Sequence, residues 1–260
     1  MDFDAQGRLV ALSSLNPEVR VYDPSGNRVG GFTHSGSPML VPAGDLKVAP
    51  DGNYALGTNE DGVRVFTPQG TFLRQYGDGD SRGITYLPSD RLWSGGAGTT
   101  VRVFDTQSGA QIGTFTANQQ TMSYSMQYSP TTDTVLIVDA DRDAGGVFER
   151  DLSGILLREF DVPLPQTFVF SATRGPNDDV FATTGHLTLD VVHWHADGSV
   201  AGTINVYPFD KSTVRIIWAG VVPEPTSAVI AIGVGCLSVL CGRRKQKKRP
   251  AARPCISAPV

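Results

Sequence analysis

The chain has 260 residues, 40% of them hydrophobic, so it is long enough to bury a core and is not expected to be disordered. Its 29 glycines and 17 prolines exclude a helical bundle and, without a fixed period, collagen; they favour many short strands joined by tight turns. The net charge of −4 combines a basic C-terminal end with an acidic remainder, and because that remainder repels phosphate backbones, we expect no nucleic-acid partner.

A repeat of about 40 residues runs through most of the chain. Five turn glycines are spaced 44, 39, 45 and 44 residues apart, and a bulky apolar residue follows each glycine by six positions. The glycines are Gly26, Gly70, Gly109, Gly154 and Gly198, and the apolar residues are Phe32, Tyr76, Phe115, Phe160 and Ile204. This constant register indicates one structural unit repeated five times.

Each repeat is predicted to end in a β-hairpin. The segments 19–22, 63–66 and 101–104 read Val-Arg-Val-aromatic before the first three glycines, which is a strand composition. The turn at 23–26 reads Asp-Pro-Ser-Gly, with a side-chain acceptor first, a fixed φ second and a residue free to take positive φ last. The fourth and fifth copies, at 146–149 and 191–194, are looser but still β-branched and aromatic.

A second set of turns supplies two further strands for each repeat. These turns lie between apolar runs at residues 5–7, 50–52, 88–90, 130–133 and 176–178. Four short strands in about 40 residues describe one propeller blade. We therefore predict an all-β protein with a β-propeller of about five four-stranded blades over residues 1–218, or a fragment of a six- or seven-bladed ring. An antiparallel sandwich or a solenoid is the alternative fold. The segment 213–218 resembles the first strand of another blade, so the number of blades that close the ring stays open.

The repeats resemble those of the WD40-like and NHL-like propeller families. The resemblance is carried by Val-Arg-Val-Phe-Asp at 101–105 and by the hairpin with its glycine and aromatic residue that follows. The aromatic-Asp pair occurs only at 22–23 and 104–105, and no Gly-His dipeptide precedes the blades. The resemblance therefore implies the propeller superfamily rather than one subfamily.

The C-terminal part is predicted to be a membrane anchor. A linker at 219–225 ends in Pro223, Glu224 and Pro225, and an uncharged apolar run follows at 226–242. As a helix, this run would rise ~26 Å, close to the ~30 Å hydrocarbon core. The basic cluster after it consists of Arg243, Arg244, Lys245, Lys247, Lys248 and Arg249. Because bases that follow a span stay in the cytoplasm, we expect a transmembrane helix at 226–242, a cytoplasmic tail at 243–260 and the propeller outside.

The order of motif, span and basic cluster resembles the PEP-CTERM sorting signal of Gram-negative bacteria, with a plain single-span anchor as the alternative. The resemblance implies that an exosortase-like protease cuts near Pro223–Pro225 and that the protein reaches the cell envelope or the extracellular surface after transient anchoring in the inner membrane. Residues 1–4 enter the first blade without the features of a signal peptide, so we expect the true start to lie upstream. Residues 250–260 run past the basic cluster, which departs from the family pattern.

The sequence assigns no catalytic residue, cofactor or metal site. His193 and His195 stand at strand spacing on one face, as a metal pair would, but no third ligand is indicated. Asp139, Asp141 and Asp143 resemble a calcium loop that lacks its glycine and its bidentate glutamate, so calcium binding is left open. The three cysteines, at 236, 241 and 255, lie in the tail, so the repeats hold no disulfide or cysteine-based metal site.

We therefore expect a non-enzymatic, surface-displayed module that binds an unknown protein or polysaccharide through its loops or central channel, or is associated with the extracellular matrix. The alternative is a propeller hydrolase of the lactonase or gluconolactonase kind. Such an enzyme needs inward carboxylates and Asn or His on its inner strands. The predicted inner strands, at 46–48, 84–86, 126–128, 168–170 and 215–217, are apolar with an occasional Lys, Thr, Gln or Arg.

Overall fold

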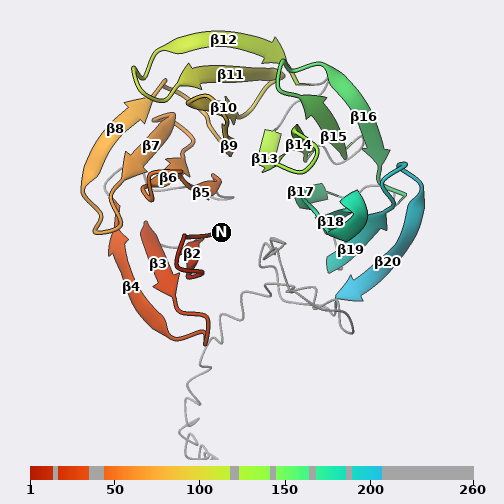
Figure 1. Ribbon diagram of the computed structural model, residues 1–260, viewed down its shortest axis with the longest axis horizontal. Helices are drawn as coiled ribbons and strands as arrows, with labels where there is room; N and C mark the ends of the chain where they lie inside the picture. Colours follow the sequence, from red (N-terminus) through yellow and green to blue (C-terminus); the bar gives the residue numbers. More distant parts are fainter. Residues whose placement is uncertain are drawn as a thin grey trace, which may run out of the picture.

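The computed structural model describes residues 1–13, 17–34, 44–117, 123–140, 145–163, 168–185 and 189–206, and they form five four-stranded antiparallel sheets. The sheets stand as blades around a central axis, each with its first strand innermost and its fourth outermost (Figure 1). The predicted all-β class and the five four-stranded blades of a β-propeller are confirmed, rather than a sandwich or a solenoid.

The strands follow one another along the chain within every blade. Blade 1 contains β1 (Asp2–Phe3), β2 (Leu9–Leu12), β3 (Glu18–Tyr22) and β4 (Arg28–Thr33). Blade 2 contains β5 (Leu46–Val48), β6 (Tyr54–Gly57), β7 (Val63–Phe66) and β8 (Phe72–Tyr76). Blade 3 contains β9 (Gly83–Leu87), β10 (Arg91–Gly95), β11 (Thr100–Asp105) and β12 (Gln111–Thr116). Blade 4 contains β13 (Ser123–Ser129), β14 (Thr134–Asp139), β15 (Gly146–Asp151) and β16 (Leu156–Asp161). Blade 5 contains β17 (Phe168–Arg174), β18 (Val180–Gly185), β19 (Leu189–Trp194) and β20 (Val200–Val206), with a short 3-10 turn, η1 (Pro176–Asp178), between β17 and β18.

The predicted hairpins are present in all five blades. Every repeat glycine has positive φ, between 77° and 90°, and in blade 1 the Gly26 N–H donates to the Asp23 carbonyl at 2.9 Å. The pairing of the third strand with the fourth shifts register beside each of these turns, for example between Val103 and Phe104. This repeated β-bulge increases the local twist, so it bends the outer strand in the same way in each blade.

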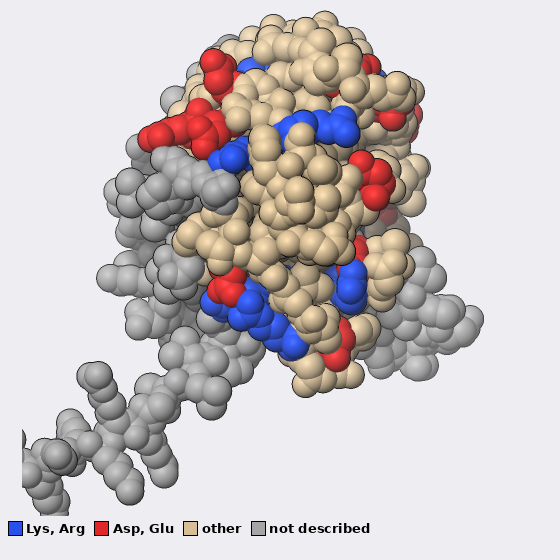
Figure 2. Space-filling model, turned by 90° about the vertical axis from the view of Figure 1, so that its left-hand side faces the viewer, with Lys and Arg blue, Asp and Glu red and all other residues tan. Residues whose placement is uncertain are grey.

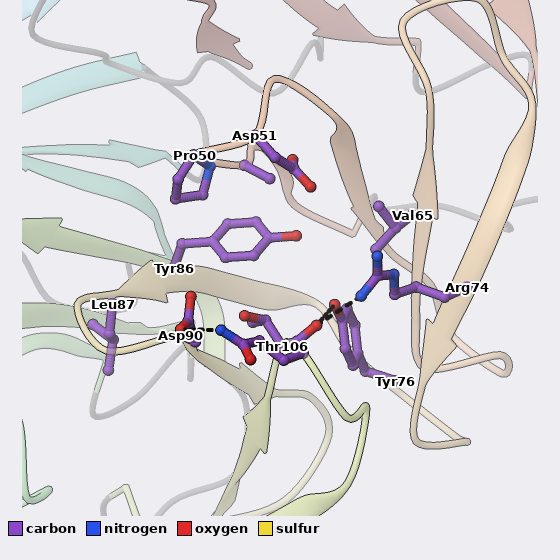
Figure 3. A pocket seen from close by; sticks show the side chains of 11 residues that line it. Pro50, Asp51, Val65, Arg74, Tyr76, Tyr86, Leu87, Asp90 and Thr106 are labelled. Carbon is purple, nitrogen blue, oxygen red and sulfur yellow. Dashed lines mark hydrogen bonds between the residues drawn. The ribbon is translucent and has the colours of Figure 1, made fainter.

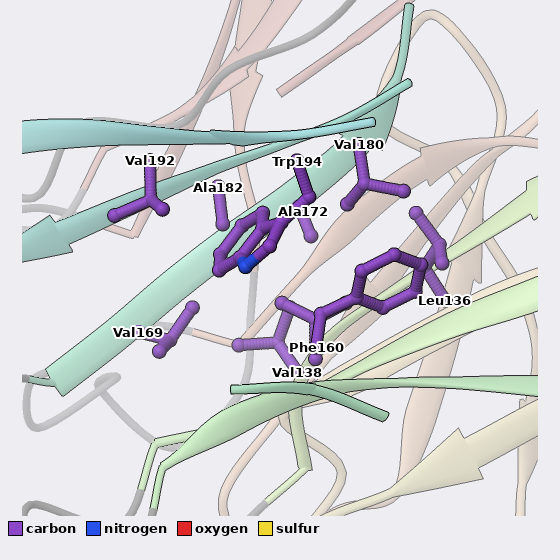
Figure 4. Packing of buried hydrophobic residues seen from close by; sticks show 10 residues of the cluster. Leu136, Val138, Phe160, Val169, Ala172, Val180, Ala182, Val192 and Trp194 are labelled. Atoms are coloured by element: carbon purple, nitrogen blue, oxygen red, sulfur yellow. The ribbon is translucent and has the colours of Figure 1, made fainter. Parts of the chain in front are cut away.

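The hydrophobic core lies between blades. Each of the four clusters of buried side chains joins one blade to the next along the chain. The repeated apolar residue takes part in these contacts: Phe160 of blade 4 is fully buried, and its ring meets Trp194 of blade 5 edge-on at 5.9 Å between centroids (Figure 4). Ile204, the equivalent in blade 5, is 41% exposed. Stability therefore depends on the packing of each blade against its neighbour rather than on one central core.

Several predicted segments lie outside the described residues. They are the extra strand at 213–218, the linker at 219–225, the apolar run at 226–242 and the tail at 243–260. Within the part of the chain that the structure describes, no helix is long and apolar enough to cross a membrane.

Candidate functional site

The innermost strands around the central axis are poor in metal ligands. The described inner strands β1, β5, β9, β13 and β17 contain one carboxylate, Asp2, and no Glu, Asn or His. The Asp2 carboxylate accepts the Val48 N–H at 2.8 Å, which ties blade 1 to blade 2. The predicted inner strands at 46–48, 84–86, 126–128 and 168–170 fall in β5, β9, β13 and β17, the fifth, at 215–217, lies outside the described residues, and the structure adds the short β1.

A hydrogen bond near the axis joins two blades that are not neighbours in the chain. The Lys47 ammonium of β5 donates to Gln127 Oε1 of β13 at 2.8 Å and lies 3.8 Å from a carboxylate oxygen of Asp45. The Lys47 side chain is only 10% exposed. The Lys47–Gln127 hydrogen bond thus ties blade 2 to blade 4 across the inner end of blade 3.

The two turns of each blade lie at the same end of the propeller, because successive strands run in opposite directions. We call this end the turn face; it carries the turns between the first and second and between the third and fourth strands of every blade. Neighbouring blades are linked there: Arg91 donates to the Leu152 carbonyl at 3.1 Å, and the Thr131 hydroxyl lies 3.3 Å from an Asp178 oxygen. The turn face is thus built from cross-linked loops on rigid strands.

A pocket of about 320 Å³ opens between blades 2 and 3 at the turn face (Figure 3). Its volume is near the lower limit of small-molecule sites. The lining comes from two turns of blade 3, one turn of blade 2 and strands β7, β8 and β9. The lining residues are Ala49, Pro50, Asp51, Val65, Arg74, Tyr76, Tyr86, Leu87, Asp90, Thr106 and Gln107.

Hydrogen bonds fix one side of this pocket. The Thr106 carbonyl accepts from Arg74 Nη1 at 2.7 Å and from the Tyr76 hydroxyl at 3.0 Å, so blade 2 holds the outer turn of blade 3. The Gln107 amide donates to Asp90 Oδ2 at 2.6 Å, which joins the two turns of blade 3. These bonds fix the two turns of blade 3 against each other and against β8, so this side of the pocket is formed before any ligand arrives.

The Tyr86 ring projects into the space between the Pro50–Asp51 turn and Thr106 (Figure 3). Burial raises the pKa of the Tyr86 phenol far above its ordinary value, and burial also raises the pKa of Tyr76. Both phenols are therefore neutral at physiological pH, and each carries one donor and one acceptor. The pocket offers aromatic, carboxylate, guanidinium and amide groups, which can hydrogen-bond to a polar ligand.

A second group of functional side chains lies on the turn face of blade 5. His193 lies on β19 and His195 directly follows that strand, on the same side as the sequence predicts, and Asp179 joins them from the residue before β18. One ligand atom from each residue falls within 4.8 Å of the others. Asp179 was not predicted from the sequence. The strand register shows why it lies there: Phe181 pairs with His193 and Val180 with Trp194, so continuing the same pairing by one residue places Asp179 opposite His195.

The other predicted site residues are not brought together by the described structure. Asp139 is buried at the end of β14, whereas Asp141 and Asp143 lie outside the described residues. The sorting motif at 223–225 and the basic residues at 243–249 also lie outside them.

Charges are mixed on the side of the propeller formed by blades 1 and 2. Figure 2 shows basic and acidic side chains interspersed there, with broad uncharged surface between them. In blade 1, hydrogen bonds from Arg20 and Arg28 lower the pKa of Glu18, which keeps this carboxylate charged. Among the described residues drawn on this side, charges of the two signs alternate rather than form one large patch.

Comparison with known proteins supports the fold alone. No family model matches the chain. No curated protein is similar to it in sequence. Among solved structures, it is similar to the β-propeller domain of Cps50 (Swd1) from Myceliophteria thermophila, with a TM-score of 0.63 and 13% identity over 82% of this chain and 75% of that one. The likeness shows the fold, a β-propeller. At this identity it shows no activity or partner, and 1262 chains of solved structures match in all, so the fold does not select a function.

Proposed function

We propose that this chain is an exported, surface-sorted β-propeller that binds extracellular polysaccharide without transforming it and is processed at its PEP-CTERM-like tail. The observation that carries the binding role is the pocket between blades 2 and 3. It is concave, braced by hydrogen bonds from β8 to a turn of blade 3 and between two turns of blade 3, and lined by two tyrosines with carboxylate, guanidinium and amide groups.

The chemistry of the pocket favours a saccharide as its ligand. Sugar hydroxyls need both donors and acceptors, which Arg74, Gln107 and the carboxylate of Asp51 supply. The Tyr86 ring offers an apolar face for the C–H side of a sugar ring, and its hydroxyl offers a polar tip. A volume of about 320 Å³ suits one or two sugar rings at the end of a chain better than the broad contact made with a folded protein.

Export and sorting rest on the C-terminal sequence. Pro223–Pro225, an uncharged apolar run and a basic cluster follow one another in the order of a sorting signal. Display at the cell surface would place the turn face among extracellular polysaccharides. The lactonase alternative finds less support, because the described inner strands offer a single carboxylate, Asp2, which is already bonded to Val48.

A glycan array that includes extracellular polysaccharides of Gram-negative bacteria tests this proposal. We expect the full chain to bind a subset of glycans, and Tyr86→Phe to weaken that binding by about 3- to 10-fold, the value of one hydrogen bond. Gln75→Ala is the matched control, because Gln75 lies on β8 next to Arg74 but does not line the pocket. No glycan binding, or equal binding by Tyr86→Phe and the parent, would contradict the proposal. Metal-stimulated hydrolysis of lactones, abolished by a chelator, would instead support the enzyme.

A further inference from the structure

Three side chains converge on one point at the turn face of blade 5, away from the pocket of blades 2 and 3. Asp179 ends the turn that follows β17, His193 lies near the end of β19, and His195 begins the turn to β20. Since β18 and β19 are paired, and residues two apart on a strand share a face, the three side chains point to the same side of the sheet.

One ligand atom from each residue lies within 4.8 Å of the others, close enough for small side-chain rotations to bring all three onto one metal ion. His193 Nε2 lies 2.8 Å from Asp179 Oδ2, and His195 Nδ1 lies 3.6 Å from Asp179 Oδ1. With metal–ligand bonds of ~2.1 Å, neighbouring ligand atoms stand about 3.0 Å apart in an octahedral site and about 3.4 Å apart in a tetrahedral one. The two distances run to different oxygens of the Asp179 carboxylate. The first is a hydrogen bond in the metal-free chain, which an ion would replace, whereas the second is too long for a hydrogen bond.

The surroundings hold two of the three groups in position. The Phe181 ring stacks on the His193 imidazole with 4.3 Å between centroids and 10° between planes. Gly175 leaves room for that ring, since a Cβ there would lie 2.5 Å from Phe181. The Ala196 N–H donates to Asp179 Oδ1 at 3.1 Å, which holds the carboxylate in place. Supports of this kind are typical of built metal sites.

We propose that Asp179, His193 and His195 bind a divalent transition-metal ion of the Zn²⁺ class. Two imidazoles and one carboxylate favour such an ion over Ca²⁺ or Mg²⁺, which prefer oxygen ligands. The side chains of Asp179 and His193 are 18% and 25% exposed, and that of His195 is 56% exposed. The ion is therefore held from one side and keeps positions open for water or for an external ligand.

Calorimetric titration with ZnCl₂ tests this site. The sample is the full chain with its three tail cysteines replaced by serine, without an affinity tag and freed of metal by a chelator, because thiols and tags bind zinc themselves. We expect one Zn²⁺ per chain and no comparable binding of Ca²⁺. His195→Gln and Asp179→Asn should each weaken Zn²⁺ binding by at least the ~10- to 100-fold that loss of a supporting residue costs. Asp197→Asn is the control, because Asp197 is an acidic residue of the same turn that accepts hydrogen bonds from Ser199 and is not one of the three proposed ligands.

Loss of zinc binding can be told apart from loss of folding. His195 is exposed, so His195→Gln should leave the far-ultraviolet circular dichroism spectrum and the melting temperature of the metal-free chain unchanged. Retained zinc affinity in both ligand variants, no zinc binding by the parent up to millimolar concentration, or equal affinity for Ca²⁺ would each overturn the proposal. Glycan binding is measured separately, so failure of this site leaves the proposed function standing.

Discussion

Removal of the Phe160 side chain, which is buried between blades 4 and 5, gives the sharpest test of how the propeller is stabilised. Phe160 has no exposed surface and meets Trp194 edge-on (Figure 4). Phe160→Ala deletes a fully buried ring, which costs about 3–5 kcal/mol of unfolding free energy, of which about 0.5–1.5 kcal/mol belongs to the aromatic pair. The whole stability of a domain is about 5–15 kcal/mol, so this change should be close to the limit of folding.

The repeat supplies a matched control at the same position of blade 5. Ile204→Ala removes an apolar side chain that is 41% exposed, so it should cost less than about 1 kcal/mol. Urea unfolding and thermal melts of both variants measure the difference, with each kcal/mol lowering the melting temperature by about 2–4 °C in a domain of this size. If Phe160→Ala lowers the unfolding free energy no more than Ile204→Ala does, packing between blades does not contribute the stability inferred for it.

Three further predictions concern pH, membrane association and the metal site. Burial lowers the pKa of His34 below its ordinary value of 6.5, so the unfolded chain binds the proton more tightly than the folded chain does. The melting temperature should therefore fall as the pH drops below 6.5, and it should fall less in the His34→Gln variant. The full chain should sediment with membranes when made in a host that lacks a sorting protease, and deletion of residues 222–260 should release it; sedimentation of neither form would contradict the anchor. Phe181→Leu keeps all three metal-binding groups but removes the ring stacked on His193, so it should weaken Zn²⁺ binding by ~10- to 100-fold in calorimetry. Unchanged affinity would show that the stacking does not position the imidazole.

The strands and turns were predictable from sequence because their causes are local. Gly26 and its four equivalents need positive φ in a fixed turn, and the flanking β-branched and aromatic residues favour strands whatever surrounds them. The different environments of Phe160 and Ile204 were not predictable, because they depend on which blade packs against the outer strand.

The candidate sites were harder to predict because they join residues from separate elements. Asp179 reaches His193 and His195 only through the register of two paired strands, and a shift by one residue would turn it to the other face. The pocket needs the packing of blade 2 against blade 3, which brings Arg74 to the Thr106 carbonyl across 32 residues of sequence. A repeat pattern identifies the blades but does not show what forms between them.

The central claim is that ligand binds at the turn face, in the pocket between blades 2 and 3, and not in the central channel. Amide hydrogen exchange of the full chain, with and without the glycan that binds most tightly on the array, tests this claim most directly. We predict slower exchange in the turns at 49–53, 88–90 and 105–109, with β13 and β17 unchanged. Protection confined to the inner strands, with these three turns unaffected, would contradict it.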